Sequence, residues 1–285
     1  TPFSKRWHLN LTEENMASAP SEEHLDQLHS WTSTEIPSLA SMGFEKSEIS
    51  APEAVLSKDV LAKYADLRDV PSVQGTSRLS VHLRFGTLSI REAARAGFKH
   101  SEKWLTELIW RDFYQHIMHA FPHSMTNAFR PQYGRVPWRH SDADFETWAQ
   151  GKTGYPLVDA GMRELLATGF MHNRVRMVVA SFFCKHLLLD WRLGERHFAA
   201  HLLDFELASN VGGWQWAAGS GCDAAPYFRV FNPTSQLQKF DRQHEYVKQW
   251  VPEFGTPAYP EPMVDHKMAR QRAIDTYKAA LATTP

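Results

Sequence analysis

The stretch Asp204-Phe-Glu-Leu-Ala-Ser-Asn210-Val-Gly-Gly-Trp214-Gln-Trp216 places two carboxylates, two glycines and two indoles close together. Apolar residues at helical spacing lead into it, namely Phe198, Leu202, Leu203 and Leu207. We predict that a helix breaks at residues 212–213, because paired glycines favour a positive φ or the close approach of another segment. A helix end with carboxylates, an amide and indoles suits a planar ligand that forms hydrogen bonds. The same residues are also compatible with tryptophans that only anchor a core after a turn.

Composition limits the kind of protein. The 285 residues carry 31 basic and 32 acidic groups, a net charge of −1, so any DNA site must be a local patch. The two cysteines, Cys184 and Cys222, are too few for a disulfide scaffold, a zinc site or an iron–sulfur cluster, and we predict no metal. No stretch has the length and apolarity of a membrane span, and no signal peptide is visible. We therefore expect a cytoplasmic protein without membrane contact that acts as a monomer.

Two regions of the chain differ in residue pattern. Residues 1–60 are rich in Ser, Glu, Thr and Pro with weak periodicity, which predicts a linker with short helices lying over the body. Residues 61–285 show apolar residues at helical spacing almost throughout, interrupted at Gly and Pro residues. No stretch shows a sustained alternation of apolar and polar residues that would indicate a strand. We predict an all-α fold in which residues 61–285 form one helical domain.

The segment Gly75-Thr-Ser-Arg-Leu-Ser80 has the residues of a helix start. Thr76 or Ser77 is a suitable N-cap, and aliphatic spacing continues through Leu83, Leu88 and Ile90. Free N–H groups and hydroxyls at a helix start can hold an anion such as a diphosphate. Hydroxyls in this position more often cap only their own helix, so this segment alone leaves both interpretations open.

Residues 101–121 predict a long helix with two different faces. One face is aliphatic and suits an ordinary core, with Leu105, Leu108, Ile109, Phe113 and Ile117. The other face carries Glu107, Trp110, Arg111, Tyr114 and Met118 at helical spacing. Its indole, carboxylate and guanidinium suit a base that needs stacking and hydrogen bonds along its edge. A helix packed on both sides inside a large domain is the alternative.

Residues 155–189 predict two helices, the first beginning at Pro156 and ending at Gly169. The second begins with Asn173, Arg174, Arg176 and Met177. Cations in the first turns oppose the helix dipole, so an anionic partner is expected. Either Asp204 pairs with Arg176 as a structural ion pair, or a phosphate or another anionic ligand lies nearby.

Several longer motifs follow one another in the chain. They are Tyr64-Ala-Asp-Leu-Arg68-Asp-Val-Pro71, Gly75-Thr-Ser-Arg-Leu-Ser80, Glu107-Leu-Ile-Trp110-Arg-Asp-Phe-Tyr114, Gly151-Lys-Thr-Gly-Tyr-Pro156, Met171-His-Asn-Arg-Val-Arg-Met177, Gly212-Gly-Trp-Gln-Trp-Ala-Ala-Gly-Ser-Gly-Cys-Asp-Ala-Ala-Pro-Tyr-Phe-Arg-Val-Phe-Asn-Pro233 and Lys239-Phe-Asp241. Through them the chain resembles the FAD-binding domain of the DNA photolyase/cryptochrome family, most of all the class I cyclobutane pyrimidine dimer photolyases. The resemblance implies an all-α flavin domain with FAD as its cofactor. Thr1-Pro-Phe3 resembles the point that follows an N-terminal α/β antenna domain in the family, so such a domain is expected in the full-length protein.

The resemblance also implies a reaction and a set of residues. Excited, fully reduced FAD gives an electron to a cyclobutane pyrimidine dimer flipped out of damaged DNA, the ring splits, and the electron returns. The residues implied at FAD are Tyr64, Thr76, Ser77, Arg78, Leu79, Ser80, Arg111, Arg176, Asp204, Phe205, Glu206 and Asn210. Those implied at DNA are Arg68, Glu107, Trp110, Tyr114, Asn173, Arg174, Met177, Trp216 and Gln236. Trp138, Trp191 and Trp214 match the electron-transfer chain of the family, and Glu107 and Asn210 are implied as further catalytic residues.

The subfamily is indicated by the pair His172-Asn173, because (6-4) photolyases carry His-His in the matching motif for proton transfer at their lesion. Asn210 also fits dimer repair, since plant cryptochromes typically have Asp opposite the flavin N5. Departures from many class I members are Glu206 for Asp, Val211 for Asn and Phe170 for Trp. The alternatives to repair are a cryptochrome-like blue-light receptor and a flavin-free helical module that binds nucleic acid.

Overall fold

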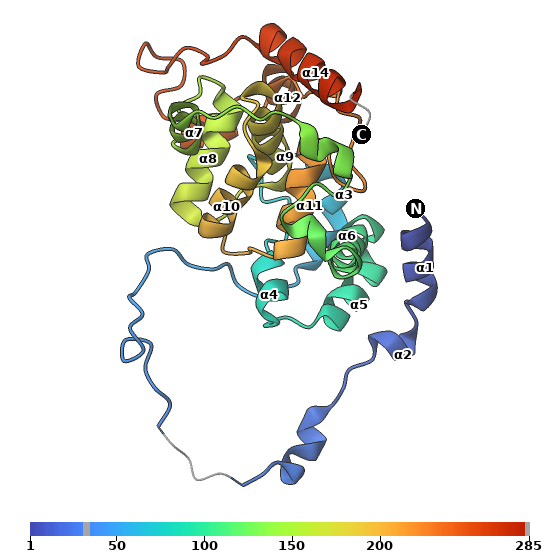
Figure 1. Cartoon of the computed structure of the whole chain (residues 1–285). Coiled ribbons are helices and arrows are strands. Elements are labelled where there is room, and N and C mark those ends of the chain that lie inside the picture. The colour runs from blue at the N-terminus through green and yellow to red at the C-terminus, as the bar shows by residue number, and fades with distance from the viewer. Residues whose placement is uncertain (31–34, 283–285) are drawn as a thin grey trace.

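The computed structural model describes residues 1–30 and 35–282, and these form helices joined by turns (Figure 1). The elements are α1 (Pro2–Asn10), α2 (Glu13–Met16), η1 (Ser21–Gln27), α3 (Lys58–Leu67), α4 (Ser80–Phe85), α5 (Ile90–His100), α6 (Glu102–Ala120), η2 (Pro122–Met125), η3 (Pro131–Arg135), α7 (Asp142–Ala149), α8 (Pro156–Thr168), α9 (Asn173–Ser181), η4 (Phe182–His186), α10 (Trp191–His201), α11 (Leu207–Ala218), α12 (Pro233–Phe240), α13 (Glu245–Trp250) and α14 (His266–Ala282). The described part has no β-strand, only an isolated bridge between Arg139 and Leu189, so the predicted all-α fold is confirmed. Within that part, no helix combines the length and apolarity needed to cross a membrane.

The described parts of the N-terminal segment contact the helical body through α1 and α2 at one end and through Pro52 and Leu56 at the other. Trp7 Nε1 donates to Asp112 Oδ2 on α6 at 2.9 Å, and Met16 is buried in a cluster with residues of α5. All residues in 17–30 and 35–51 are exposed, and Figure 1 shows the described parts of this segment away from the body. The prediction that the segment lies over the body therefore holds for α1 and α2 but not for residues 17–30 and 35–51, because all of these described residues are exposed. The division into residues 1–60 and 61–285 stays a prediction.

The main core lies among α7 to α11, η4 and α13. Its largest fully buried side chains include Trp148, Trp191, Trp214, Phe182 and Phe183. A second cluster lies under α3 to α6 and includes Leu61, Leu79, Trp104 and Leu105. The predicted site residues come from the helices that border these two clusters.

Helix α11 runs without interruption from Leu207 to Ala218, so the predicted break at residues 212–213 is wrong. Neither glycine has a positive φ. A Cβ at Gly212 would lie 2.3 Å from the ring of Tyr114, so α6 and α11 approach each other closely there. The glycine therefore serves packing rather than a turn. The break lies earlier instead, between the end of α10 at His201 and the start of α11.

The predicted helix start at residues 75–80 also differs in the structure. Helix α4 begins at Ser80 with Leu79 as its N-cap, and no side chain caps it. Ser77 lies two residues before this N-cap, and its Oγ instead accepts from Trp104 Nε1 on α6 at 3.2 Å. By contrast, α6 begins as predicted, with Ser101 Oγ accepting from Trp104 N.

The two helices predicted in residues 155–189 are confirmed. Helix α8 begins at Pro156 and ends at Gly169 in the left-handed conformation, as its local signals indicate. The second helix, α9, passes at Phe182 into the π-helical turn η4.

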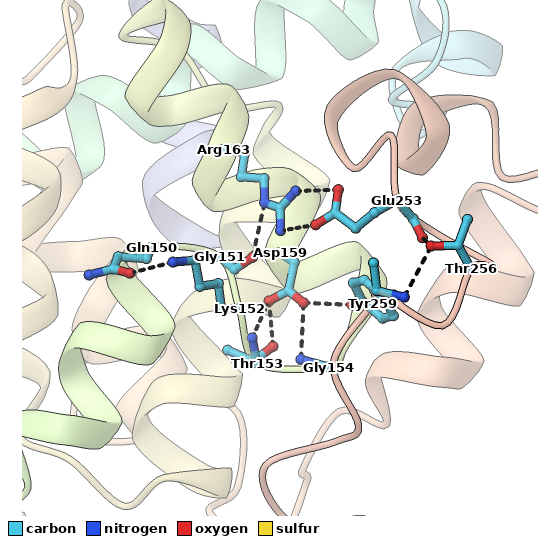
Figure 2. A network of polar contacts seen from close by, with 11 residues as sticks. Gln150, Gly151, Lys152, Thr153, Gly154, Asp159, Arg163, Glu253, Thr256 and Tyr259 are labelled. Atoms are coloured by element: carbon cyan, nitrogen blue, oxygen red, sulfur yellow. Dashed lines mark hydrogen bonds and ion pairs between the residues drawn. The ribbon is translucent and has the colours of Figure 1, made fainter.

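Asp159 on α8 joins this helix to the C-terminal part of the chain (Figure 2). Its carboxylate accepts from Thr153 N at 2.7 Å, Thr153 Oγ1 at 2.6 Å, Gly154 N at 3.0 Å and Tyr259 Oη at 2.5 Å. One turn further along, Arg163 donates two hydrogen bonds to Glu253, at 2.6 and 2.9 Å. The turn at residues 151–155 and the segment at 253–259 are thus attached to α8 by the same network.

Candidate functional site

Arg176, Asp204 and Ser80 come from three different parts of the chain and contact one another. Arg176 Nη2 donates to both carboxylate oxygens of Asp204, at 3.0 and 3.2 Å, and Ser80 hydrogen-bonds the same carboxyl group. Burial by itself raises the pKa of Asp204, but the charge of Arg176 and these hydrogen bonds outweigh it, so the net shift is downward. The predicted ion pair is present and joins α9 to the segment between α10 and α11, and the hydrogen bond of Ser80 adds the start of α4.

Arg78 extends this group of predicted cofactor residues. The guanidinium groups of Arg78 and Arg176 both lie over the ring of Phe170, at 4.6 and 5.6 Å from its centroid. Arg78 has a φ of 51°, a conformation that costs energy for a residue with a side chain and is found mostly at functional sites. It directly precedes the uncapped start of α4, so cations, hydroxyls and free N–H groups lie close together.

Glu206 and Asn210 have defined roles at the start of α11. Glu206 caps the helix, because its oxygens accept from Ala208 N at 3.0 Å and from Ser209 N at 2.9 Å. Asn210 Nδ2 donates to Glu195 Oε1 at 2.8 Å and to Glu195 O at 3.0 Å. Burial raises the pKa of Glu195 and the bond from Asn210 acts against this rise. The two bonds fix which way the Asn210 amide is turned.

A row of alternating charges joins the predicted DNA-facing residues. Arg68 donates to Glu107 on α6, Arg68 Nε lies 4.0 Å from Asp69 Oδ1, and Arg174 Nη2 donates to Asp69 Oδ1 at 2.8 Å. The guanidinium of Arg68 also lies 5.3 Å from the ring centroid of Tyr64. Burial raises the pKa of Tyr64, and the charge of Glu107 adds to the rise. Residues from α3, α6 and α9 that the sequence separates widely are therefore brought together.

Arg174 is less available than the sequence suggested. Besides its pair with Asp69, its guanidinium lies 4.4 Å from the ring centroid of Phe240 on α12, and its Nη1 lies 3.8 Å from Met177 Sδ. Its side chain is 19% exposed. The contact places Met177 beside it, while Asn173 at the start of the same helix is exposed. The positive charge of Arg174 is already partly neutralised by Asp69 before any phosphate approaches.

The second face of α6 is partly open. Trp110 is 39% exposed, and its ring lies 5.9 Å from that of Tyr114 at an interplanar angle of 30°. Tyr114 Oη donates to Asp223 Oδ2 at 2.9 Å, and burial together with the Asp223 charge raises the pKa of this tyrosine. Trp110 is thus an exposed indole held by neighbouring rings, which is the arrangement expected of a stacking surface.

The remaining predicted residues lie at the borders of these groups. Arg111 Nη2 donates to Leu83 O at 3.3 Å, Phe205 O accepts from Arg84 Nε at 2.6 Å, and the ring of Trp216 lies 5.9 Å from that of Phe231. Leu79 is buried, and Thr76 is half-buried. Gln236 Oε1 is buried without a hydrogen-bond partner in the described part of the chain.

The three tryptophans of the predicted electron chain lie in different environments. Trp214 and Trp191 are buried, and Trp138 is half-buried. Among the described residues no ring contact joins any two of the three. Instead the ring of Trp214 contacts Trp148 at 6.1 Å, and that of Trp138 contacts Tyr277 at 6.0 Å. The electron chain therefore stays a prediction.

Some contributors to the site were not found from the sequence. His172 Nδ1 accepts from Arg174 N at 3.2 Å and so caps α9, while burial lowers the pKa of this histidine to about 4 and keeps it neutral. Glu195 and Asp69 orient Asn210 and Arg174. Asp69 lies within a quoted motif, so its position beside Arg68 was the available signal. Glu195 lies 15 residues from Asn210, and no short-range pattern marks that pairing.

Three comparisons with known proteins agree with this arrangement. A family profile described as the FAD binding domain of DNA photolyase matches residues 104–257. A deoxyribodipyrimidine photo-lyase of Neurospora crassa is 42% identical over 79% of this chain and 43% of its own length. The crystal structure of a class III photolyase from Agrobacterium tumefaciens superposes with a TM-score of 0.76 at 40% identity, over 79% of this chain and 54% of that one. A cryptochrome from Synechocystis gives a TM-score of 0.71 at 28% identity, over 86% of this chain and 61% of that one.

The chain belongs to the photolyase FAD-binding family. It spans about half the length of the curated relatives that it matches.

The residues present fit FAD. The donors around the start of α4, with Arg78 and Arg176 nearby, suit the diphosphate. On α11, Gly213 is exposed and a Cβ there would meet nothing within 4 Å, so the helix surface at this residue is open. Metal binding has no comparable support, since no group of three or more His, Cys, Asp or Glu residues suited to a metal occurs in residues 1–30 and 35–282.

Proposed function

We propose that the protein repairs cyclobutane pyrimidine dimers in DNA by a light-driven reaction that uses bound FAD. The observation that carries the proposal is the contact of Ser80, Arg176 and Asp204, three residues assigned to the cofactor from separate motifs. The name deoxyribodipyrimidine photo-lyase, which several relatives at 42–46% identity carry, supports the same activity for this chain. Damaged DNA is then the partner.

The roles of the residues follow from their contacts. Bound FAD in its fully reduced form supplies an electron when it absorbs light. The ion pair with Asp204 would hold the guanidinium group of Arg176 beside the cofactor, so that this side chain does not extend into solvent. Glu195 turns the Asn210 amide so that its oxygen is left to accept a hydrogen bond.

The lesion would meet the α6 side of the site. Trp110 offers its exposed ring for stacking with a flipped base. Glu107 is bonded to Arg68 and its side chain is 31% exposed, so its carboxylate is placed to accept hydrogen bonds from the edge of a pyrimidine. The pair His172-Asn173 favours the cyclobutane dimer over the (6-4) lesion, because the second histidine for proton transfer is replaced by an amide.

A cryptochrome-like light receptor without repair is the second candidate. It is favoured by the similarity to the Synechocystis cryptochrome, which is 28% identical over 86% of this chain. A receptor of this kind would use the same flavin pocket and the same buried tryptophans. It would differ in having no turnover of damaged DNA.

The test is repair of a defined oligonucleotide. Reduced protein is mixed with a thymine oligonucleotide that contains one cyclobutane dimer, and the thymine absorbance is followed under blue light. Recovery in light, with none in the dark or with protein omitted, supports repair. A flavin spectrum without recovery supports the receptor. Absence of a flavin spectrum after addition of FAD supports the flavin-free module.

A further inference from the structure

The turn between α8 and α9 contacts the charged residues that were assigned to the cofactor. The ring of Phe170 in this turn lies 4.6 and 5.6 Å from the guanidinium groups of Arg78 and Arg176. Met171 O accepts from Arg176 Nε at 2.7 Å, while Nη2 of the same arginine donates to Asp204. The position of the Arg176 side chain therefore depends on where this turn lies.

His172, the last residue of the turn, holds the first turn of α9. Its Nδ1 accepts from Arg174 N at 3.2 Å, and its carbonyl oxygen accepts from Val175 N at 2.9 Å and from Arg176 N at 3.0 Å. Burial lowers the pKa of His172 to about 4, so at neutral pH the ring is uncharged and Nδ1 can accept a hydrogen bond. A shift of His172 would therefore move the backbone of both arginines.

The turn is itself held by a buried carboxyl group, that of Glu164 on α8. Its Oε2 accepts from His172 N at 3.2 Å and from the hydroxyl of Tyr246 on α13 at 2.6 Å. Glu164 is 3% exposed, and Tyr246 is 1% exposed. Burial raises the pKa of Glu164, while these two hydrogen bonds and the charges of Arg78 and Arg176 act against the rise. A single buried oxygen atom thus connects α8, α13 and the residue that caps α9.

Without this oxygen, two buried donors would lack an acceptor. His172 N donates no other hydrogen bond in the described part of the chain. A buried N–H group or hydroxyl without a partner is costly, and the chain can reduce the cost by moving the donor toward another acceptor. The ring of Tyr246 is packed in the main core, whereas His172 lies in a turn. Loss of the acceptor is therefore expected to displace the turn rather than α13.

We propose that Glu164 is a positioning residue, which through His172 sets where Arg174 and Arg176 lie relative to DNA and the cofactor. It acts through the turn and needs no contact with either ligand. Side chains that are held in place before a ligand arrives bind it with less loss of conformational freedom. The cofactor part of this proposal rests on FAD binding, and the DNA part rests on the proposed repair function.

Two substitutions of Glu164 separate its hydrogen bonds from its charge. Both bonds end on the same oxygen, so Glu164→Gln keeps an oxygen that can accept them and should bind FAD within about twofold of the unaltered protein. Glu164→Leu has a similar volume but no acceptor, and it should bind FAD about tenfold more weakly, the equivalent of one hydrogen bond. FAD affinity is measured by titrating the flavin-free protein and following flavin fluorescence, and circular dichroism verifies that each variant is folded.

Tyr246→Phe and Tyr259→Phe form a matched pair on the same helix. Each removes a hydroxyl that donates to a buried carboxyl group of α8, Glu164 at 2.6 Å in one case and Asp159 at 2.5 Å in the other. Asp159 otherwise accepts from residues 153 and 154, outside the candidate site. Both variants should lose similar stability in urea unfolding, while only Tyr246→Phe should weaken FAD binding, by about threefold. Equal FAD affinity of the two variants would leave Glu164 a structural role only and would overturn the proposal.

DNA binding in the dark tests the part of the proposal that concerns Arg174. The affinity for dimer-containing DNA should lose up to about one charge of its salt dependence in Glu164→Leu and none in Glu164→Gln, and an unchanged slope in both would overturn this part. An unaltered protein that neither binds nor repairs such DNA would count against the proposed function and leave the FAD result valid. FAD affinity of Glu164→Gln as weak as that of Glu164→Leu would overturn the inference. If Glu164→Leu does not fold, the two tyrosine variants decide in its place.

Discussion

Replacing Lys185 by Met should stabilise the protein at acidic and neutral pH, although it removes a hydrogen bond. Lys185 lies in η4 and is 2% exposed. This burial lowers its pKa from 10.5 to about 7, which means that the folded protein holds the ammonium at a cost of about 5 kcal/mol at low pH. The variant loses the hydrogen bond from Nζ to Ala218 O at 2.9 Å and the contact of Nζ with the Tyr277 ring, together about 2 kcal/mol. The net gain is therefore about 3 kcal/mol at pH 6.

The sign of the pH dependence follows from which state binds more protons. Between pH 7 and 10.5 the unfolded chain keeps the lysine protonated while the folded chain releases the proton. The stability of the unaltered protein therefore rises with pH across this range, and the advantage of Lys185→Met shrinks. By about pH 9 the two proteins should be equally stable, because the remaining cost of about 2 kcal/mol matches the contacts that the variant lacks.

Urea unfolding followed by circular dichroism at pH 6 and pH 9, with FAD at the same saturating concentration, measures this difference. Lys239→Met is the matched control, since Lys239 is exposed and its Nζ lies 5.0 Å from the ring centroid of Phe240. That variant should change stability little, and equally at both pH values. A Lys185→Met protein that is less stable at pH 6, or whose difference does not vary with pH, would refute the reasoning.

The other predictions concern the proposed site. Trp214→Phe should nearly stop light-driven reduction of oxidised FAD while repair by chemically pre-reduced protein continues, and normal photoreduction would remove Trp214 from the electron chain. Trp110→Ala should weaken binding of dimer-containing DNA by about 1–3 kcal/mol with unchanged FAD content, whereas loss of flavin would make Trp110 a packing residue. Arg174→Ala should lower the slope of affinity against salt concentration by at most about one charge, and an identical slope would place Arg174 outside the interface. Glu206→Ala should cost about 1 kcal/mol in urea unfolding through loss of the α11 cap, and Glu206→Gln should restore most of it.

Local signals in the sequence were sufficient for both ends of α8 and for the start of α6. Pro156 and Gly169 mark the limits of α8, and Ser101 marks the start of α6, because each acts through its own backbone conformation or a hydrogen bond three residues away. The wrong predictions have a common cause. At Ser77 and Gly212 the decisive contact comes from α6, through Trp104 and Tyr114. The glycines indicated a close approach as one of two alternatives, but local spacing did not identify the segment that approaches.

In the candidate site, too, some contacts could be predicted from local sequence and others depend on contacts between separate helices. Unfavourable charge at the start of α9 predicted an anionic partner, and the Arg176–Asp204 pair was one of the two alternatives that this left. The orientation of Asn210 by Glu195 and the pairing of Arg68 with Glu107 depend on how separate helices are placed, so residue types alone did not indicate them. The family resemblance named three of these four residues without giving their partners. Their mutual contacts came only from the fold.

The hydrogen bonds around Asp159 have a consequence for the order in which the chain is completed. The partner that closes the network, Tyr259, lies 100 residues further along. During synthesis, α8 emerges well before Tyr259 and Glu253. The carboxylate of Asp159 and the guanidinium of Arg163, both on α8, must therefore stay hydrated until these partners arrive. The same late part of the chain brings Tyr277, whose ring covers Lys185. Water is thus excluded from the interior around α8 and η4 only when the C-terminal residues have been synthesised. In a chain that ended before them, the side chains of Asp159, Arg163 and Lys185 would stay in contact with water.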